Sequence, residues 1–232
     1  MKLDKTYLSS LIKKAVKAPF KHPWVFLPGA ALLVSNYVIF EILRMINLEL
    51  NTKTLFFIGM AASSLVFLAI TAFFGSGLIG LCFDLHKGKH TRNFLNYSYN
   101  FWFRNFIILV LGQLISVGIT LSSTLIAEKL GKQMMLSTQN ASMLYIFILA
   151  LGFFGIFCFF SLSNVFSVCE NRKAFSSLMK SASFVSKNYF LVAAVLLVVL
   201  LGYFWIGKIR ISFIRDMLFS IVLPPFFIMF LV

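Results

Sequence analysis

Six apolar runs, each close to the length that crosses a lipid bilayer, dominate this chain of 232 residues. A bilayer core about 30 Å thick is crossed by about 20 residues of α-helix, which satisfies all its backbone hydrogen bonds internally. Hydrophobic residues make up 60% of the chain and charged residues only 12%, about half the charged share of a soluble domain. The sequence therefore predicts an all-α, polytopic bundle of six transmembrane helices that forms a single integral membrane domain, 1–232. The predicted spans are 24–45, 55–83, 105–127, 143–168, 188–206 and 216–232.

Two of these runs predict irregular spans. The second run is longer than a bilayer requires and contains Gly75, Gly77 and Gly80, so we expect it to tilt or bend. The last run is barely long enough and contains Pro224 and Pro225, which remove helical hydrogen bonds.

A second pattern recurs three times with a period of 83 residues, the separation of Leu95 from Ile12 and of Leu178 from Leu95. Each copy has a basic amphipathic segment, then Lys or Arg, then a residue that opens an apolar run. Such a period predicts tandem copies of one unit: an interfacial helix, a span, an external turn and a returning span. The predicted units are about 1–83, 84–166 and 167–232. Further equivalent positions are Ala15, Ser98 and Ser181; Lys21, Arg104 and Lys187; and His22, Asn105 and Asn188.

The distribution of charge predicts the orientation and the partner. The chain has 21 Lys and Arg against 7 Asp and Glu, a net charge of +14. Six spans would put both termini on one side together with two thirds of the Lys and Arg, which predicts cytoplasmic termini in the cell (inner or plasma) membrane. The basic residues are scattered over boundary loops and not gathered in one domain. We therefore expect anionic lipid headgroups, and not nucleic acid, as their partners.

The three basic segments before the odd-numbered spans have apolar residues at i, i+3, i+4 and i+7, the spacing of an amphipathic helix. Such helices lie in the membrane interface with their lysines on anionic headgroups. Alternatively, they only link the spans and cover the inner mouth of the bundle. The residues predicted to contact lipid or a membrane partner are Lys13, Lys14, Lys17, Lys21, Arg92, Arg104, Lys173, Lys180 and Lys187.

Two carboxylates end apolar runs on the predicted cytoplasmic side: Asp84 after the second run and Glu170 after the fourth. One interpretation is that they pair with neighbouring Lys or Arg at the headgroup boundary. The other is that they hold the inner rim of the bundle by anchoring the interfacial helices through Arg92, Arg172 or Lys173.

Polarity inside the predicted spans is mild. Asn, Gln and Ser commonly form hydrogen bonds between membrane helices, so structural contacts are one interpretation of these residues. A polar pocket formed by Gln113, Ser161 and Asn164 is the alternative. The polar residues concerned are Asn36, Ser63, Ser64, Gln113, Ser116, Ser161, Ser163 and Asn164.

Two motifs resemble known sites only superficially. Residues 75–80 read GSGLIG, but a dinucleotide site needs this pattern between a strand and a helix, so close helix packing is the better interpretation. His86 and His90 are spaced like metal ligands, but Lys87 and Lys89 between them oppose a cation. We expect no metal, no cofactor and no catalytic residues, which disfavours an enzyme.

The segment 169–197, CENRKAFSSLMKSASFVSKNYFLVAAVLL, resembles a pattern in a group of six-span prokaryotic membrane proteins. The group includes the UPF0259 (YciC-like) proteins and the membrane domain found with glycerophosphodiester phosphodiesterases. The matching residues are an acidic span end, a Ser in the basic segment, and Lys-Asn opening the next span: Glu170, Ser181, Lys187 and Asn188. The resemblance implies a role in envelope or lipid homeostasis and carries over no catalytic residues, because the phosphodiesterase chemistry lies in a separate soluble domain.

Three functions follow as hypotheses. The first is a non-enzymatic membrane protein that contacts anionic lipid, or another membrane protein, through its basic interfacial helices. The second is a small-molecule transporter or a substrate-binding membrane subunit of one, which needs a cavity between the spans. The third is an enzyme at the cytoplasmic interface, which needs Asp84, Glu170, His86 and His90 to converge.

Overall fold

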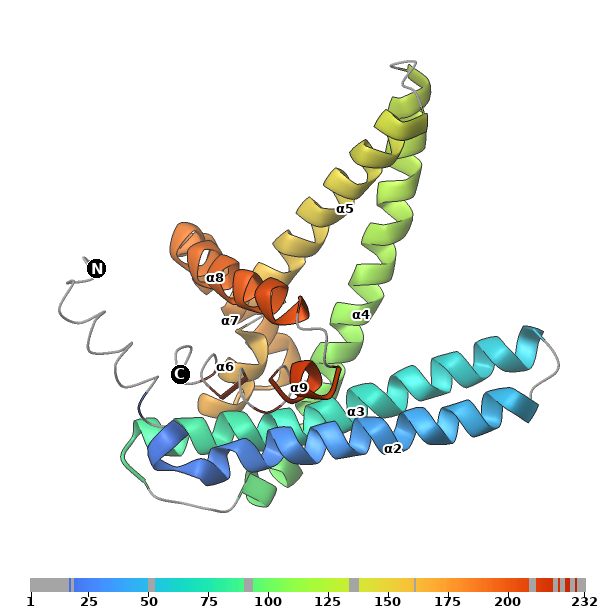
Figure 1. The fold of residues 1–232 in the computed structure, drawn as a ribbon. Helices are drawn as coiled ribbons and strands as arrows, with labels where there is room; N and C mark the ends of the chain where they lie inside the picture. Colours follow the sequence, from blue (N-terminus) through green and yellow to red (C-terminus); the bar gives the residue numbers. More distant parts are fainter. Residues whose placement is uncertain are drawn as a thin grey trace.

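A computed structural model describes most of the chain, and every regular element in the described part is helical (Figure 1). The described residues are 17, 19–49, 53–89, 94–133, 138–160, 162–208, 212–218, 221, 224–225 and 228. The elements are η1 (Pro23–Phe26), α2 (Leu27–Glu49), α3 (Lys53–His86), α4 (Phe94–Gln133), α5 (Thr138–Phe160), α6 (Ser163–Cys169), α7 (Ala174–Lys187), α8 (Tyr189–Gly207) and α9 (Ser212–Met217).

Among the described residues, four stretches of helix are long and apolar enough to cross a membrane, or five if a bent pair is counted as one span. This confirms the all-helical class and identifies the protein as membrane-embedded. The four stretches overlap the first four predicted runs. The bent pair is Ala174–Lys187 with Tyr189–Val198, and the angle between its two helices is 99°. Most of the predicted sixth span, 216–232, lies outside the described residues. The four stretches are Pro23–Ile42, Ala61–His86, Phe94–Gln133 and Gln139–Cys169.

The long helices form two hairpins, α2–α3 and α4–α5, that diverge from each other in Figure 1. The divergence leaves much apolar surface uncovered by protein. Few residues are buried in the most apolar 18-residue stretch of each span. The buried share is 17%, 44%, 11% and 6% in chain order. Apolar patches of this extent are rare on soluble monomers. Lipid tails are therefore the natural covering of both hairpins.

Two glycines let the hairpins join, because they allow α4 to approach α3 closely. A Cβ added at Gly80 would lie 2.0 Å from Cγ of Tyr97, and one at Gly77 would lie 2.5 Å from Oγ of Ser98. A Cβ added at Gly75 would meet nothing within 4 Å. The interpretation of the GxGxxG motif as a helix-packing element is thus confirmed at two of its three glycines.

The structure differs from the sequence prediction at the second amphipathic segment. Residues 94–104 are not a separate interfacial helix but the first turns of α4, which runs unbroken for 40 residues. No glycine or proline occurs between Phe94 and Gly112, so nothing interrupts the helix where the apolar run begins. Ser98 on this segment and Asn105 directly after it are buried, and the inner face of the segment packs on α3 and not on lipid.

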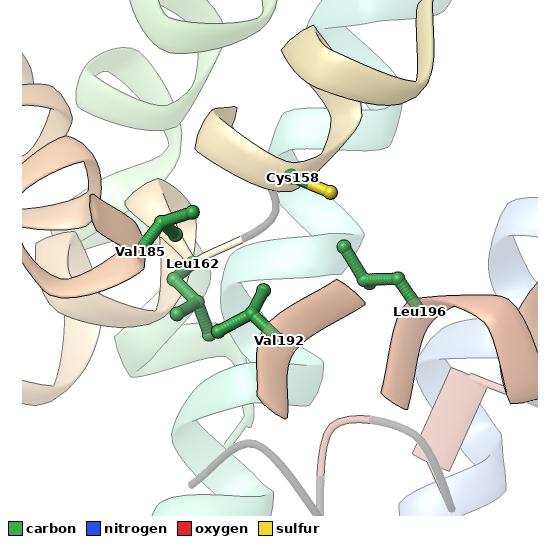
Figure 2. Packing of buried hydrophobic residues seen from close by; sticks show 5 residues of the cluster. All are labelled: Cys158, Leu162, Val185, Val192 and Leu196. Carbon is green, nitrogen blue, oxygen red and sulfur yellow. The ribbon is translucent and has the colours of Figure 1, made fainter. Parts of the chain in front are cut away.

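Helices α7 and α8 pack around the end of α5 in a buried apolar cluster. Figure 2 shows side chains from the end of α5, from α7 and from α8 converging with Leu162, which precedes α6. Val185 and Leu196 in this cluster are fully buried. The turn at 170–173, between α6 and α7, folds the chain back, so that α7 packs against the end of α5. The cluster consists of Cys158, Leu162, Val185, Val192 and Leu196.

From the close approach of α3 and α4 we predict how two glycine substitutions change the stability of the protein in detergent. Gly80→Ala should lower the free energy of unfolding by about 1–3 kcal/mol, because its methyl group overlaps the Tyr97 ring. Gly75→Ala, five residues earlier in the same helix, should be neutral or stabilise by up to about 1 kcal/mol, because alanine is the better helix former. Thermal unfolding of both variants measures the difference. Equal stability of the two variants would contradict the close packing.

Candidate membrane-surface site

The basic helix α7 presents three faces of different chemistry. At about 100° per residue, these faces lie roughly 120° apart around the helix axis. The first face is buried in the protein and consists of Ala174, Ser177, Ser181 and Val185. The second carries Phe175 and Met179, which are 72% and 60% exposed. The third carries Lys180 and Lys187, and Lys173 precedes the helix on the same side.

This arrangement corrects one detail of the sequence prediction. The i, i+3, i+4, i+7 spacing of the sequence predicts one apolar face made of Phe175, Leu178, Met179, Ala182 and Val185. In the structure Val185 turns inward to the cluster of Figure 2, whereas Phe175 and Met179 point away from the protein. Small residues, mainly serines, provide the protein-facing side.

The ends of α7 explain its length and direction. The chain is extended at Lys173, and the Ser177 hydroxyl donates to the Lys173 carbonyl at 3.0 Å. The helix ends at Asn188, whose side-chain amide donates to the Phe184 carbonyl at 3.0 Å and whose backbone leaves the helical region. A bend of 99° then starts α8. A residue with a short polar side chain thus turns the chain at the boundary that the repeat predicted.

The α7 helix is joined to α4 through the turn at 170–172. Asn171 adopts a positive φ of 52°, a conformation that asparagine tolerates better than most residues. Its Oδ1 accepts a hydrogen bond of 2.7 Å from Nη1 of Arg104. Arg104 also donates to the Arg172 carbonyl at 3.5 Å, and Arg172 pairs with Glu170 at 2.5 Å. Arg104 and Glu170 therefore hold this turn in place.

Asp84 is held differently from Glu170. It is only 4% exposed, and its Oδ1 accepts a hydrogen bond of 2.8 Å from the hydroxyl of Tyr97 on α4. Farther along the same α3–α4 contact, the side-chain amide of Asn105 donates to Ser76 at 2.7 Å, and Ser76 donates to the Ala72 carbonyl at 2.6 Å. A buried polar seam therefore runs beside the two glycines.

Arg104 binds the turn at 170–172, and the other predicted basic residues fall into three groups. Lys17 and Lys21 are exposed at the start of the α2–α3 hairpin, and Lys87 and Lys89 are exposed at its end. These two ends meet, because Val25 packs with Leu78, Cys82 and Leu85 in a buried cluster. Lys173, Lys180 and Lys187 belong to the α7 region. Lys13, Lys14 and Arg92 lie outside the described residues.

The predicted polar pocket is composed differently in the structure. Gln113 lines a groove of about 450 Å³ together with Asn36, Ser63 and Ser64. Asn164 lies on α6 and does not line this groove, and Ser161 lies outside the described residues. Periodicity on one helix could not reveal that polar residues of α2, α3 and α4 share one hollow.

No protein family, curated protein or solved structure matches the chain. Within the described part, no group of three or more His, Cys, Asp and Glu residues is arranged to hold a metal ion. His90 of the HKGKH segment is outside that part.

Tyr97 was not identified as important from the sequence. The hydrogen bond that its hydroxyl donates to Asp84 leads to a second prediction. Tyr97→Phe removes one donor from a buried carboxylate and should lower the free energy of unfolding by about 1–3 kcal/mol. Tyr99→Phe is the matched control, because Tyr99 is 71% exposed on the same helix and should be near neutral. Chemical denaturation in detergent measures both. Equal effects would show that the Tyr97 hydroxyl does not hold Asp84.

Proposed function

We propose that this chain is a non-enzymatic, six-span membrane protein built from three like-oriented units. It binds anionic lipid at the cytoplasmic surface of a prokaryotic inner membrane through basic segments at the interface, of which α7 is an interfacial helix. The resemblance of segment 169–197 to the UPF0259 (YciC-like) group is in keeping with a role in envelope or lipid homeostasis.

One observation carries the lipid-binding proposal: α7 is bent by 99° from an apolar helix of 19 residues. Helix α8 is about 29 Å long, close to the thickness of the hydrocarbon core. If α8 crosses the bilayer, α7 lies along its surface. Phe175 and Met179 then enter the acyl boundary while Lys180 and Lys187 reach the headgroups.

The magnitudes support this placement. Complete burial of a Phe or Met side chain contributes about 1.5–3 kcal/mol. Each lysine near an anionic surface adds about 1 kcal/mol. Together these terms exceed the thermal energy severalfold, so a short helix held by the protein on one side has a strong preference for the interface.

A pair of equivalent contacts supports the repeat. Ser98 on α4 meets Gly77 near the end of α3, and the Ser181 hydroxyl on α7 donates to the carbonyl of Phe159 near the end of α5. Ser98 and Ser181 are equivalent under the 83-residue period, and Phe159 lies one residue before the equivalent of Gly77. In both units a small serine docks the next unit onto the preceding hairpin.

A lipid-binding measurement tests the function. The purified protein is titrated with phosphatidylglycerol and with phosphatidylcholine of identical acyl chains, and bound lipid is counted by native mass spectrometry. Replacing Lys173, Lys180 and Lys187 by Gln should weaken phosphatidylglycerol binding by roughly 10–100-fold and leave phosphatidylcholine unchanged. The preference of the wild type should decrease at high salt.

The matched control replaces three lysines on the predicted opposite side, Lys129, Lys132 and Lys208, by Gln. Both triple variants change the net charge by the same amount. A loss of phosphatidylglycerol binding that is the same in both would mean that net charge, and not α7, attracts the lipid.

The topology has its own test. In a variant whose Cys82, Cys158 and Cys169 are replaced by Ala, single cysteines are introduced at Lys89, Lys173 or Lys132. A membrane-impermeant maleimide should label Lys89→Cys and Lys173→Cys from the cytoplasmic side and Lys132→Cys from the other. Labelling of the first two from opposite sides would overturn the three-unit scheme.

A further inference from the structure

A groove opens where α4 leaves α3, between α2, α3 and α4, and its volume is about 450 Å³. Measured from the hydrogen bond between Asn105 and Ser76, it lies about 12 Å along α4 and about 18 Å along α3. In Figure 1 this is the region between α4 and the half of α3 that leads away from it. The groove is therefore within the apolar part of the helices.

The walls of the groove combine aromatic and uncharged polar side chains. Phe40 and Phe67, 64% and 45% exposed, provide apolar surface. Asn36 from α2, Ser63 and Ser64 from α3, and Gln113 from α4 provide amide and hydroxyl groups. None of the described residues that line the groove is charged.

The two amides have hydrogen-bonding capacity to spare. Oδ1 of Asn36 is buried and accepts no hydrogen bond from the described residues. Gln113 is exposed on the groove, and no hydrogen bond joins its amide to another described residue. An unpaired amide in hydrocarbon is costly because lipid tails offer neither donors nor acceptors. An occupant with polar groups removes this cost.

A neighbouring groove of about 300 Å³ shares Gln113 but has fewer hydrogen-bonding groups available to a ligand. Its other polar residues are Ser116 and Thr120. Their hydroxyls already donate to the carbonyls of Gly112 and Ser116, at 2.8 and 3.0 Å. The groove that contains Asn36 is thus the better site for a hydrogen-bonding ligand.

The chemistry of the lining selects among membrane components. A phosphate headgroup would find no cation in the groove, so its charge would be unpaired at this depth. A ligand with carbonyls alone would satisfy the amide N–H donors but would leave Oδ1 of Asn36 without a donor. A neutral lipid with both a hydroxyl and carbonyls satisfies both sets.

We propose that the groove between α2, α3 and α4 binds an uncharged hydroxylated lipid of the diacylglycerol type. The Asn36 side chain rotates so that its carbonyl accepts the hydroxyl of the ligand, the Gln113 amide donates to an ester carbonyl, and the acyl chains lie against Phe40 and Phe67. This site is separate from the basic surface of α7 and takes a lipid of different charge.

Native mass spectrometry with dioleoylglycerol as the probe tests the proposal. Gln113→Leu and Asn36→Leu should each weaken its binding at least tenfold. The control Gln133→Leu removes the same side chain from an exposed position at the far end of α4 and should bind as the wild type does. Binding of dioleoyl phosphatidylglycerol should be unchanged in all three, which separates this site from the α7 surface.

A second probe tests the donor requirement. The 3-O-methyl ether of dioleoylglycerol lacks the hydroxyl donor and should bind the wild type at least fivefold more weakly than dioleoylglycerol. The two probes should bind equally to Asn36→Leu. Thermal unfolding of each variant identifies those that fail to fold. If Asn36→Leu fails to fold, Gln113→Leu still tests the proposal, because Gln113 is exposed.

Three results would overturn the proposal. The first is equal binding of dioleoylglycerol by Gln113→Leu and the wild type. The second is no binding by the wild type. The third is a change of oligomeric state in Gln113→Leu without any loss of lipid, which would assign the groove to a second copy of this chain.

Discussion

The close crossing of α3 and α4 is the contact on which the rest of the structure depends. Two glycines on α3 admit the Tyr97 ring and the Ser98 hydroxyl of α4 at distances that any larger residue would prevent. Because helices that cross at such a point diverge on either side of it, the two hairpins part, as Figure 1 shows. The divergence creates the groove at Gln113 and also the space beside α3 and α4 in which α6 and α7 pack. A small increase of side-chain volume at Gly77 or Gly80 would therefore disturb the contact that joins the two hairpins.

The crossing also shows how a membrane protein associates its helices without a hydrophobic driving force between them. Lipid tails are as apolar as the side chains of the spans, so close van der Waals packing and hydrogen bonds must supply the preference. Here both are combined. The glycines bring the helices together, and the bonds of Tyr97 to Asp84 and of Asn105 to Ser76 align them. Ser181 provides a similar hydrogen bond where α7 contacts α5.

Polar groups are divided between two environments. Those at the ends of the hairpins, including Arg104 and Glu170, bind one another or backbone groups of a turn. The lysines that precede α2, follow α3 and surround the α7 region remain available to anionic groups outside the protein. The amides of Asn36 and Gln113 are different, because they lie among apolar residues and face a hollow. This separation is the basis for proposing two lipid sites on one small chain, one for an anionic lipid and one for an uncharged lipid.

The sequence by itself determined the helical membrane class, the first four apolar runs, the packing role of Gly77 and Gly80, and a basic amphipathic helix at 174–187. Each depends on a local property: the apolar content of a run, the absence of a Cβ, or the period of 3.6 residues. Tertiary structure alone decided that residues 94–104 continue into α4, that α7 turns serines inward and Phe175 outward, and that Gln113 meets Asn36 and not Asn164. Periodicity describes the faces of one helix but does not identify the partner that each face meets. That choice is made by the packing of side chains from separate helices, and no single segment of the sequence contains it.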